Sequence, residues 1–190
     1  MSGEIKKQTG SEPFIHLNGS TEVCLADYWA WAHSELNSNT ERSKLAEFLV
    51  ALAMQCTDTP SRAQQSYDIL TKEGIKIEVK TSAYLQTWEQ RNSSSINFDI
   101  ASSSGTGKSD PEYKRQADVY VFCVEKHQDK EPLNPLDVDQ WDFYPVSTEV
   151  LNTEFGEQES VAYPLLQLTG MKPCRFAELR DAVLTLAGKK

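Results

Sequence analysis

The sequence predicts an α/β protein with a mixed β-sheet of about five strands flanked by helices, and one extra helix near the N-terminus. Three patterns indicate this fold class. Apolar and charged residues alternate over Ile75–Lys80, as in a strand with one buried face. Val119–Val124 is short and continuously apolar, which is typical of a central strand covered on both sides. Near the C-terminus, apolar residues recur at helical spacing: Phe176, Leu179, Val183 and Leu186.

In the N-terminal half we expect two helices followed by a hairpin. Ser20-Thr21 can cap a helix that runs to about Leu36, and a second helix is expected over residues 40–54. Residues 67–70 and 75–80 are predicted to form two strands joined by a tight turn.

In the C-terminal half, Ile96–Ile100 alternates like a half-buried strand. Trp141–Val146 is another expected strand, and Pro145 favours an edge position for it because proline cannot donate to a neighbouring strand. The last helix is expected to stop at Gly188.

Length and composition fit a soluble globular protein, with 190 residues, 39% hydrophobic and 25% charged. We expect a flexible head over residues 1–19 and a single domain over residues 20–190. No apolar run is long enough to cross a bilayer, and Met1–Glu12 lacks the apolar centre of a signal peptide. The four widely spaced cysteines are typical of reduced thiols. These features predict a cytoplasmic protein without a membrane partner.

The net charge of −9 is unevenly distributed along the chain. Residues 125–160 contain 10 Asp and Glu but 2 Lys and Arg, so this segment carries −8 and the rest of the chain −1. Strong acidity would disfavour a nucleic-acid partner. Because the acidic segment lies downstream of the hairpin, the charge pattern permits DNA binding but does not indicate it.

The hairpin sets the position of two carboxylates. A three-residue loop over Lys72–Gly74, with glycine in the left-handed conformation, places Asp68 opposite Glu78. Their Cβ atoms would then be roughly 5 Å apart, and Lys80 would share the face of Glu78. Two carboxylates this close repel each other unless a proton or a cation lies between them. A two-residue loop would instead place Asp68 opposite Val79 and separate the two carboxylates.

A third carboxylate interrupts an apolar helix, since Glu47 is the one charged residue of Leu45–Met54. An ionised carboxylate buried without a partner costs several kcal/mol, an order-of-magnitude figure. A metal ion, Lys80 or Arg42 could remove that cost if Glu47 faces the hairpin. Alternatively, Glu47 emerges at the rim of the sheet and meets solvent or a basic side chain.

These residues resemble the motif of the PD-(D/E)XK nuclease superfamily, in which a helical Glu and an Asp precede Glu-x-Lys on a strand. Here the corresponding residues are Glu47, Asp68 and Glu78-Val79-Lys80, and Tyr67 stands where many members have proline. The likeness is closest to a bacterial branch of the superfamily. It includes three stretches over roughly Leu25 to Val150: residues 39–50, 77–88 and 115–124. The resemblance implies a restriction-endonuclease-like core and a metal-dependent endonuclease that acts on DNA.

The resemblance also implies roles for the residues of the motif. Asp68, Glu78 and the carbonyl of Val79 would bind Mg²⁺, for which Mn²⁺ can substitute, and Glu47 would hold a second ion or a water. Lys80 would orient the attacking water or stabilise charge, as base or as electrostatic clamp. Carboxylate and carbonyl oxygens suit Mg²⁺.

Six residues near these elements are candidates for further contacts. Gln86 could contact water or phosphate, or be a surface amide. Two aromatic residues could stack on bases or pack in the core, and three cations could contact phosphates or be ordinary solvated charges. These five residues are Tyr84, Trp88, Arg91, Lys114 and Arg115.

We therefore expect a metal-dependent DNA endonuclease, with restriction, phage defence or repair as settings. The alternative is a catalytically silent module of the same fold, or a subunit of a larger complex. Since one active site cuts one strand, double-strand cleavage favours a homodimer.

Overall fold

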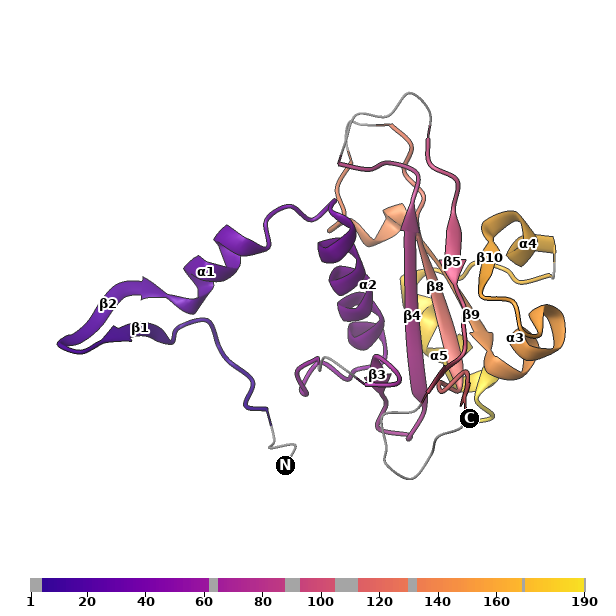
Figure 1. Ribbon diagram of the computed structural model, residues 1–190, viewed down its shortest axis with the longest axis horizontal. Coiled ribbons are helices and arrows are strands. Elements are labelled where there is room, and N and C mark those ends of the chain that lie inside the picture. The colour runs from indigo at the N-terminus through magenta and orange to yellow at the C-terminus, as the bar shows by residue number, and fades with distance from the viewer. Residues whose placement is uncertain are drawn as a thin grey trace.

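The computed structural model describes residues 5–61, 65–87, 93–104, 113–129, 133–168 and 170–189. A four-stranded sheet forms the centre of the molecule, with helices on both faces (Figure 1). The helices are α1 (Leu25–Ala32), α2 (Asn39–Ala53), α3 (Thr148–Phe155), α4 (Tyr163–Leu168) and α5 (Leu179–Leu186), with short 3₁₀ turns at Val138–Gln140 and Phe176–Glu178. Among the described residues no helix is both long and apolar enough to span a membrane.

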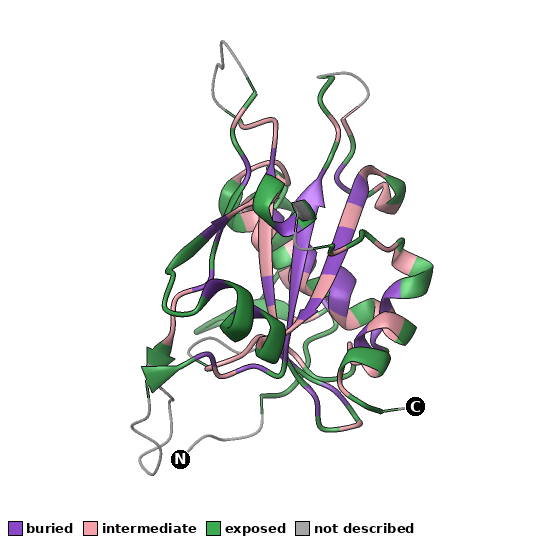
Figure 2. Cartoon of the chain, turned by 90° about the vertical axis from the view of Figure 1, so that its right-hand side faces the viewer, coloured by how far each residue is buried: buried purple, intermediate pink, exposed green. Residues whose placement is uncertain are grey.

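The sheet has the strand order β3-β4-β8-β9 and is mixed, as expected. Its strands are β3 (Ile69–Leu70), β4 (Lys76–Ala83), β8 (Val119–Glu125) and β9 (Trp141–Ser147). The pair β4–β8 is parallel, whereas β3–β4 and β8–β9 are antiparallel. The strand β8 is buried along its whole length (Figure 2), and β9, which contains Pro145, lies at the edge. The predicted α/β class, the central strand and the edge strand are confirmed.

The expected fifth strand forms but does not join this sheet. β5 (Asn97–Asp99) pairs with β10 (Ser160–Ala162) in a separate two-stranded ribbon that packs on one face of the sheet. The alternation of residues 96–100 was a correct sign of a strand, because Ile96, Phe98 and Ile100 are all buried. The partner strand comes from residues far along the chain, which local periodicity does not reveal.

Each face of the sheet covers its own core. Alternate side chains of β4 and β8, among them Ile77 and Val121, pack against α2 and α5. The other face, which includes Tyr120 and Phe122, packs against β5, β10, α3 and α4. Because β4 has β3 beside it over two residues, most of one edge of β4 is left unpaired within the described sheet.

The N-terminal region differs from the expectation. Ser20 and Thr21 do not start a helix but lie in β2 (Gly19–Cys24), which pairs with β1 (Pro13–His16). The helix α1 begins at Leu25, because Cys24 is its N-cap and donates its backbone N–H to the Asp27 carboxylate at 2.7 Å. Part of the range expected to be a head is therefore strand β1. The hairpin β1–β2 and α1 project from the body of the molecule (Figure 1).

The other predicted helices are confirmed with small shifts in their ends. The side chain of Ser38 accepts the N–H of Glu41 at 3.3 Å and caps α2, which ends at Ala53. The helix α5 ends shortly before Gly188, whose φ of 66° is the left-handed conformation of a helix stop. Two short strands, β6 (Ser103–Ser104) and β7 (Tyr113–Lys114), form a further ribbon.

Candidate functional site

The hairpin has the longer of the two loops considered from the sequence. Ile69 pairs with Ile77 and Leu70 with Lys76, which is the register expected for the longer loop. The N–H of Thr71 donates to the carbonyl of Ile75 at 2.9 Å, which closes a three-residue turn. Gly74 has φ +83°, the conformation that this turn requires of its last residue. The predicted register is confirmed.

Asp68 lies at the point where β3 ends and the edge of β4 becomes free. Its N–H donates to the Ile77 carbonyl at 2.9 Å, and its Oδ2 accepts the N–H of Val79 at 2.8 Å. The carboxylate thus occupies the place that a strand carbonyl would take beside Val79. Because the N–H and C=O of one strand residue point to the same edge, the Val79 carbonyl is directed to the side of Asp68. A carboxylate and a carbonyl are therefore presented together at this edge.

Glu78 and Lys80 lie two residues apart on one face of β4. The Lys80 ammonium contacts Oε1 of Glu78 at 2.9 Å. Both side chains are partly covered, with 21% and 26% of their surface exposed for Glu78 and Lys80 respectively, so solvent still reaches the pair. This contact fixes the ammonium of Lys80 beside the carboxylates instead of leaving it free in water.

Glu47 lies on α2, and the cationic side chain that pairs with it is not one of the two expected. The Lys44 ammonium contacts Oε2 of Glu47 at 2.6 Å, and Ser61 donates to the same oxygen at 3.3 Å. Its cation is neither Lys80 nor Arg42, which pair with Glu78 and with Glu125 of β8 respectively. The side chain of Glu47 is 15% exposed, so the carboxylate sits at a wall rather than in open solvent.

The three carboxylates interact electrostatically. Burial raises the pKa of Glu78, and the nearby charges of Asp68 and Glu47 raise it further, against the effect of Lys80. Burial and the charge of Asp68 likewise raise the pKa of Glu47, which Lys44 opposes. For Asp68, burial raises the pKa, while the Val79 hydrogen bond and the charge of Lys80 lower it. All three groups therefore hold protons more tightly than free carboxyls and gain from an added cation.

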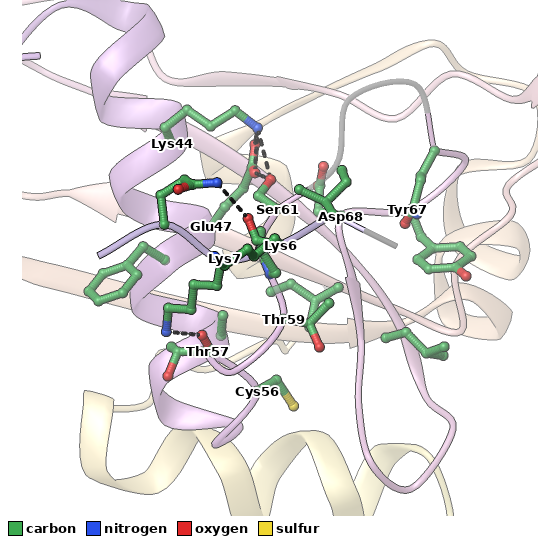
Figure 3. A pocket seen from close by; sticks show the side chains of 18 of the residues that line it. Lys6, Lys7, Lys44, Glu47, Cys56, Thr57, Thr59, Ser61, Tyr67 and Asp68 are labelled. Carbon is green, nitrogen blue, oxygen red and sulfur yellow. Dashed lines mark hydrogen bonds and ion pairs between the residues drawn. The ribbon is translucent and has the colours of Figure 1, made fainter. Parts of the chain in front are cut away.

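A cavity of about 720 Å³ opens next to two of these groups. Figure 3 shows Glu47 and Asp68 at its wall, with Lys44 bonded to Glu47 and Ser61. Its volume lies in the range of roughly 300–1,000 Å³ that ligand sites occupy. Glu47 and Asp68 are thus accessible to a ligand from the side of α2 and β3.

The donor atoms fit a hard divalent cation, but their present partners are lysines. Asp68, Glu78 and the Val79 carbonyl offer oxygen ligands of the kind that Mg²⁺ takes. In the described part of the chain, however, no three Asp, Glu, His or Cys side chains gather closely enough to hold one ion. Glu47 and Glu78 are each paired with a lysine instead. Binding of an ion requires these carboxylates to turn from their lysines toward Asp68.

Arg115 is placed differently from the expectation of a phosphate contact, which was wrong. Its guanidinium is buried and donates to the carbonyls of Ile100, Gly156 and Gln158 at 2.8, 2.8 and 3.0 Å. It also donates to the Asn152 side chain at 2.7 Å. With these acceptors, Arg115 ties the β5–β10 side of the molecule together and is not presented to a ligand.

Gln86 and Tyr84 also lie in other surroundings than the carboxylates. Gln86 accepts from Arg42 at 3.4 Å and donates to the Ala83 carbonyl at 3.1 Å, at the far end of β4 from Asp68. Tyr84 is half-buried and packs against the second core, which agrees with the packing alternative. Among the remaining candidates, Lys114 is an exposed residue of β7, and Trp88 and Arg91 lie outside the described residues.

Two features of the site were missed from the sequence. Lys44 lies three residues before Glu47, and this spacing puts two helical side chains on one face, so it could have been recognised. The other is the segment Ile5–Gln8, which lines the cavity together with Trp29. No local pattern in residues 5–8 signals that contact.

Comparison with known protein families identifies one family. Residues 24–161, well over half of the chain, match the family model of bacteriophage T4 endonuclease IV. The matched range contains all four residues of the cluster: Glu47, Asp68, Glu78 and Lys80. Among curated proteins, none matches the chain significantly. The chain belongs to the bacteriophage T4 endonuclease IV family and is thereby a member of a nuclease family.

Proposed function

We propose that this protein is a metal-dependent DNA endonuclease with a PD-(D/E)XK-type site, working in the cytoplasm. The observation that supports the proposal is the hairpin register, in which the Asp68 carboxylate accepts the N–H of Val79 and the neighbouring Glu78 pairs with Lys80. Membership in an endonuclease family supports the same activity. Restriction, phage defence and repair are all settings in which such an activity serves.

Each residue would have the role that the resemblance to the PD-(D/E)XK motif implies. Asp68, Glu78 and the Val79 carbonyl would hold Mg²⁺, or Mn²⁺ in its place, and Glu47 would hold a second ion or a bound water. When bound, the ion supplies charge neutralisation on the phosphate and a more acidic water. Lys80, held against Glu78 at 2.9 Å, is placed to orient the attacking water and to stabilise charge that develops on the phosphate.

Plasmid cleavage tests the proposal. The purified protein is expected to nick or linearise plasmid DNA with Mg²⁺ or Mn²⁺, and not with EDTA. Glu78→Ala and Lys80→Ala, prepared in the same way, are expected to lose this activity. Equal cleavage by the wild type and both variants would show that a contaminant cuts the DNA, and the proposal would fail.

A second candidate is a catalytically silent module of the same fold, acting as a subunit of a larger complex. The observation that favours it is the pairing of Glu47 and Glu78 with lysines, which neutralises two carboxylates without a metal. Calorimetric titration separates the candidates. A silent module has no need to bind Mg²⁺, whereas the endonuclease is expected to bind it in a manner that Asp68→Asn weakens.

We further propose a homodimer, since cleavage of both strands needs two sites. The projecting arm of β1, β2 and α1 supports it, because several of its apolar side chains are exposed: Leu17 by 100%, Trp31 by 83% and Ile15 by 81%. Apolar surface of this kind marks interaction sites. Analytical ultracentrifugation is expected to show a dimer that Leu17→Ser combined with Trp31→Ser dissociates, and a monomer at all wild-type concentrations would refute it.

A further inference from the structure

The cavity next to Glu47 and Asp68 has one wall made by a segment far away in the sequence. Residues Ile5–Gln8 line it, opposite the α2 and hairpin residues that carry the carboxylates. Figure 3 shows Lys6 and Lys7 crossing the cavity in front of α2. This segment lies outside the range 24–161 that matches the family. The family match therefore does not include it, although it lines the same cavity as Glu47 and Asp68.

Several contacts hold the segment in place. The Lys7 ammonium donates to the carbonyl of Thr57, in the loop after α2, at 2.7 Å. The Glu12 carboxylate accepts the N–H groups of Thr9 and Gly10 at 3.0 and 2.9 Å. These backbone hydrogen bonds lower the pKa of Glu12 to about 2, so the turn is kept by an ionised group.

Gly10 fixes the direction in which the segment leaves this turn. Its φ is +93°, and a Cβ there would meet the ring of Trp29 at 3.0 Å. Its carbonyl accepts the N–H of Ala26 at 2.9 Å, which joins the turn to α1. Only glycine combines this conformation with the close approach of the indole. The segment Ile5–Gln8 is therefore aimed at the cavity by specific contacts.

The segment brings positive charge to the carboxylate cluster. In the described part of the chain, neither the Lys6 nor the Lys7 ammonium pairs with a carboxylate. By contrast, Lys44 and Lys80 each have an acidic partner. A protein of net charge −9 repels a polyanion unless cations are concentrated where the polyanion binds. Among the described residues, Lys6 and Lys7 bring two ammonium groups without a carboxylate partner to the cavity, and that of Lys7 has only the neutral Thr57 carbonyl as its acceptor.

We propose that Ile5–Gln8 is part of the substrate-binding surface, with Lys6 and Lys7 binding phosphates of the nucleic-acid backbone that enters the cavity. This inference rests on the proposed endonuclease function. Lys6 and Lys7 of the N-terminal segment thus take the role of phosphate contacts that the sequence suggested for Arg115, which is buried. The contacts hold the strand and do not touch the reacting atoms, so they act on binding.

The test compares two double variants that remove the same charge. Lys6→Ala/Lys7→Ala removes the cavity cations, and Lys172→Ala/Lys189→Ala removes two exposed lysines that do not line the cavity. Binding of a labelled DNA duplex is measured by fluorescence anisotropy at several salt concentrations without Mg²⁺. Each lost phosphate contact is expected to reduce the slope of log K against log salt by about 0.9, hence by about 1.8 for two contacts. The control variant is expected to keep the wild-type slope, and in cleavage assays the cavity variant is expected to raise KM.

A second comparison keeps all charges. Gly10→Ala introduces strain at φ +93° and a clash with Trp29, so it is expected to displace the segment and weaken binding in the same direction. Gly188→Ala is the matched control, since its φ is also positive at +66° but nothing lies within 4 Å of the added Cβ. It is expected to bind like the wild type.

The outcomes separate the inference from the function on which it rests. If the wild type cuts DNA but both lysine double variants have its affinity and salt slope, the inference is overturned and the endonuclease remains. If the wild type neither binds nor cuts DNA, or Glu78→Gln cuts as well as the wild type, the proposed function is wrong and the inference falls with it.

Discussion

Two groups of buried charges begin on α2, and their environments are opposite. Arg42 uses all five of its N–H donors: one to Glu125 at 3.0 Å and the others to Asn39, Gln86 and the carbonyls of residues 37 and 85. Both members of the Arg42–Glu125 pair are 1% exposed. This group is closed, electrically neutral and shielded from water.

The second group, formed by Glu47, Asp68, Glu78 and their lysines, is open. Three carboxylates face two ammonium groups, Lys44 and Lys80, and the cavity reaches Glu47 and Asp68. Burial is the main cause that raises the pKa values of these three carboxyls. The difference teaches that a fully buried ion pair such as Arg42–Glu125 belongs to the fold, even though Oε1 of Glu125 has no hydrogen-bond partner among the described residues. An unbalanced set beside a cavity is prepared for a ligand.

The largest expected effect is on the open group. Glu78→Gln removes a metal ligand, so cleavage is expected to fall by at least about a hundredfold. The thermal unfolding temperature is expected not to fall, because the substitution removes a repelling charge. Plasmid cleavage and calorimetry measure the two effects. Glu154→Gln, an exposed carboxylate of α3, is the control and is expected to behave as the wild type. A large loss of stability in Glu78→Gln would make Glu78 a structural residue like Glu125.

The closed group is expected to respond in the opposite way. Arg42→Ala leaves the Glu125 carboxylate buried and unpaired, at a cost of about 3–5 kcal/mol in the free energy of unfolding. Urea denaturation measures this cost, and cleavage per folded molecule is expected to change little. Replacing both partners, as Arg42→Met/Glu125→Leu, is expected to cost less than Arg42→Ala alone. If the double variant is the less stable of the two, the pair has a role beyond neutralising charge.

Arg115 is a second buried arginine, and its removal is expected to cost less stability than that of Arg42. Arg115→Ala is expected to lower the free energy of unfolding by about 1–3 kcal/mol, because buried carbonyls lose their donor. The salt dependence of DNA binding is expected to stay as in the wild type. If Arg115→Ala instead reduces the slope of log K against log salt by about 0.9, the Arg115 guanidinium binds a phosphate after all.

These residues also show what the sequence could predict. Strand alternation and a turn ending in Gly74 are local signals, and they predicted the hairpin register in which Ile69 pairs with Ile77. The surroundings of Arg115 could not be predicted from local patterns, because the carbonyls that accept its hydrogen bonds belong to residues up to 43 positions away. For the same reason the partner of β5 was missed, although its strand pattern was recognised. The segment Ile5–Gln8 reaches the cavity through the turn at Gly10 and the Lys7–Thr57 contact, which are tertiary features.

The smallest expected effect is on stability as a function of pH. Because the pKa of Asp68 is raised in the folded protein, its ionisation opposes folding: the stabilising contribution is full below the ordinary carboxyl pKa and is lost as pH rises through the raised value. Asp68→Asn, which can still accept from Val79, is therefore expected to melt at a higher temperature than the metal-free wild type at neutral pH. The difference is expected to vanish near pH 3. Differential scanning calorimetry measures it, and a lower melting temperature at neutral pH would contradict the raised pKa.

The central claim is that the open group holds a divalent cation, and anomalous diffraction from a crystal soaked in Mn²⁺ tests it most directly. We predict a peak roughly 2.0–2.3 Å from carboxylate oxygens of Asp68 and Glu78 and close to the Val79 carbonyl, with Glu78 turned away from Lys80. Intact Glu47–Lys44 and Glu78–Lys80 pairs with no peak at Asp68, at Mn²⁺ concentrations that support cleavage, would contradict the account.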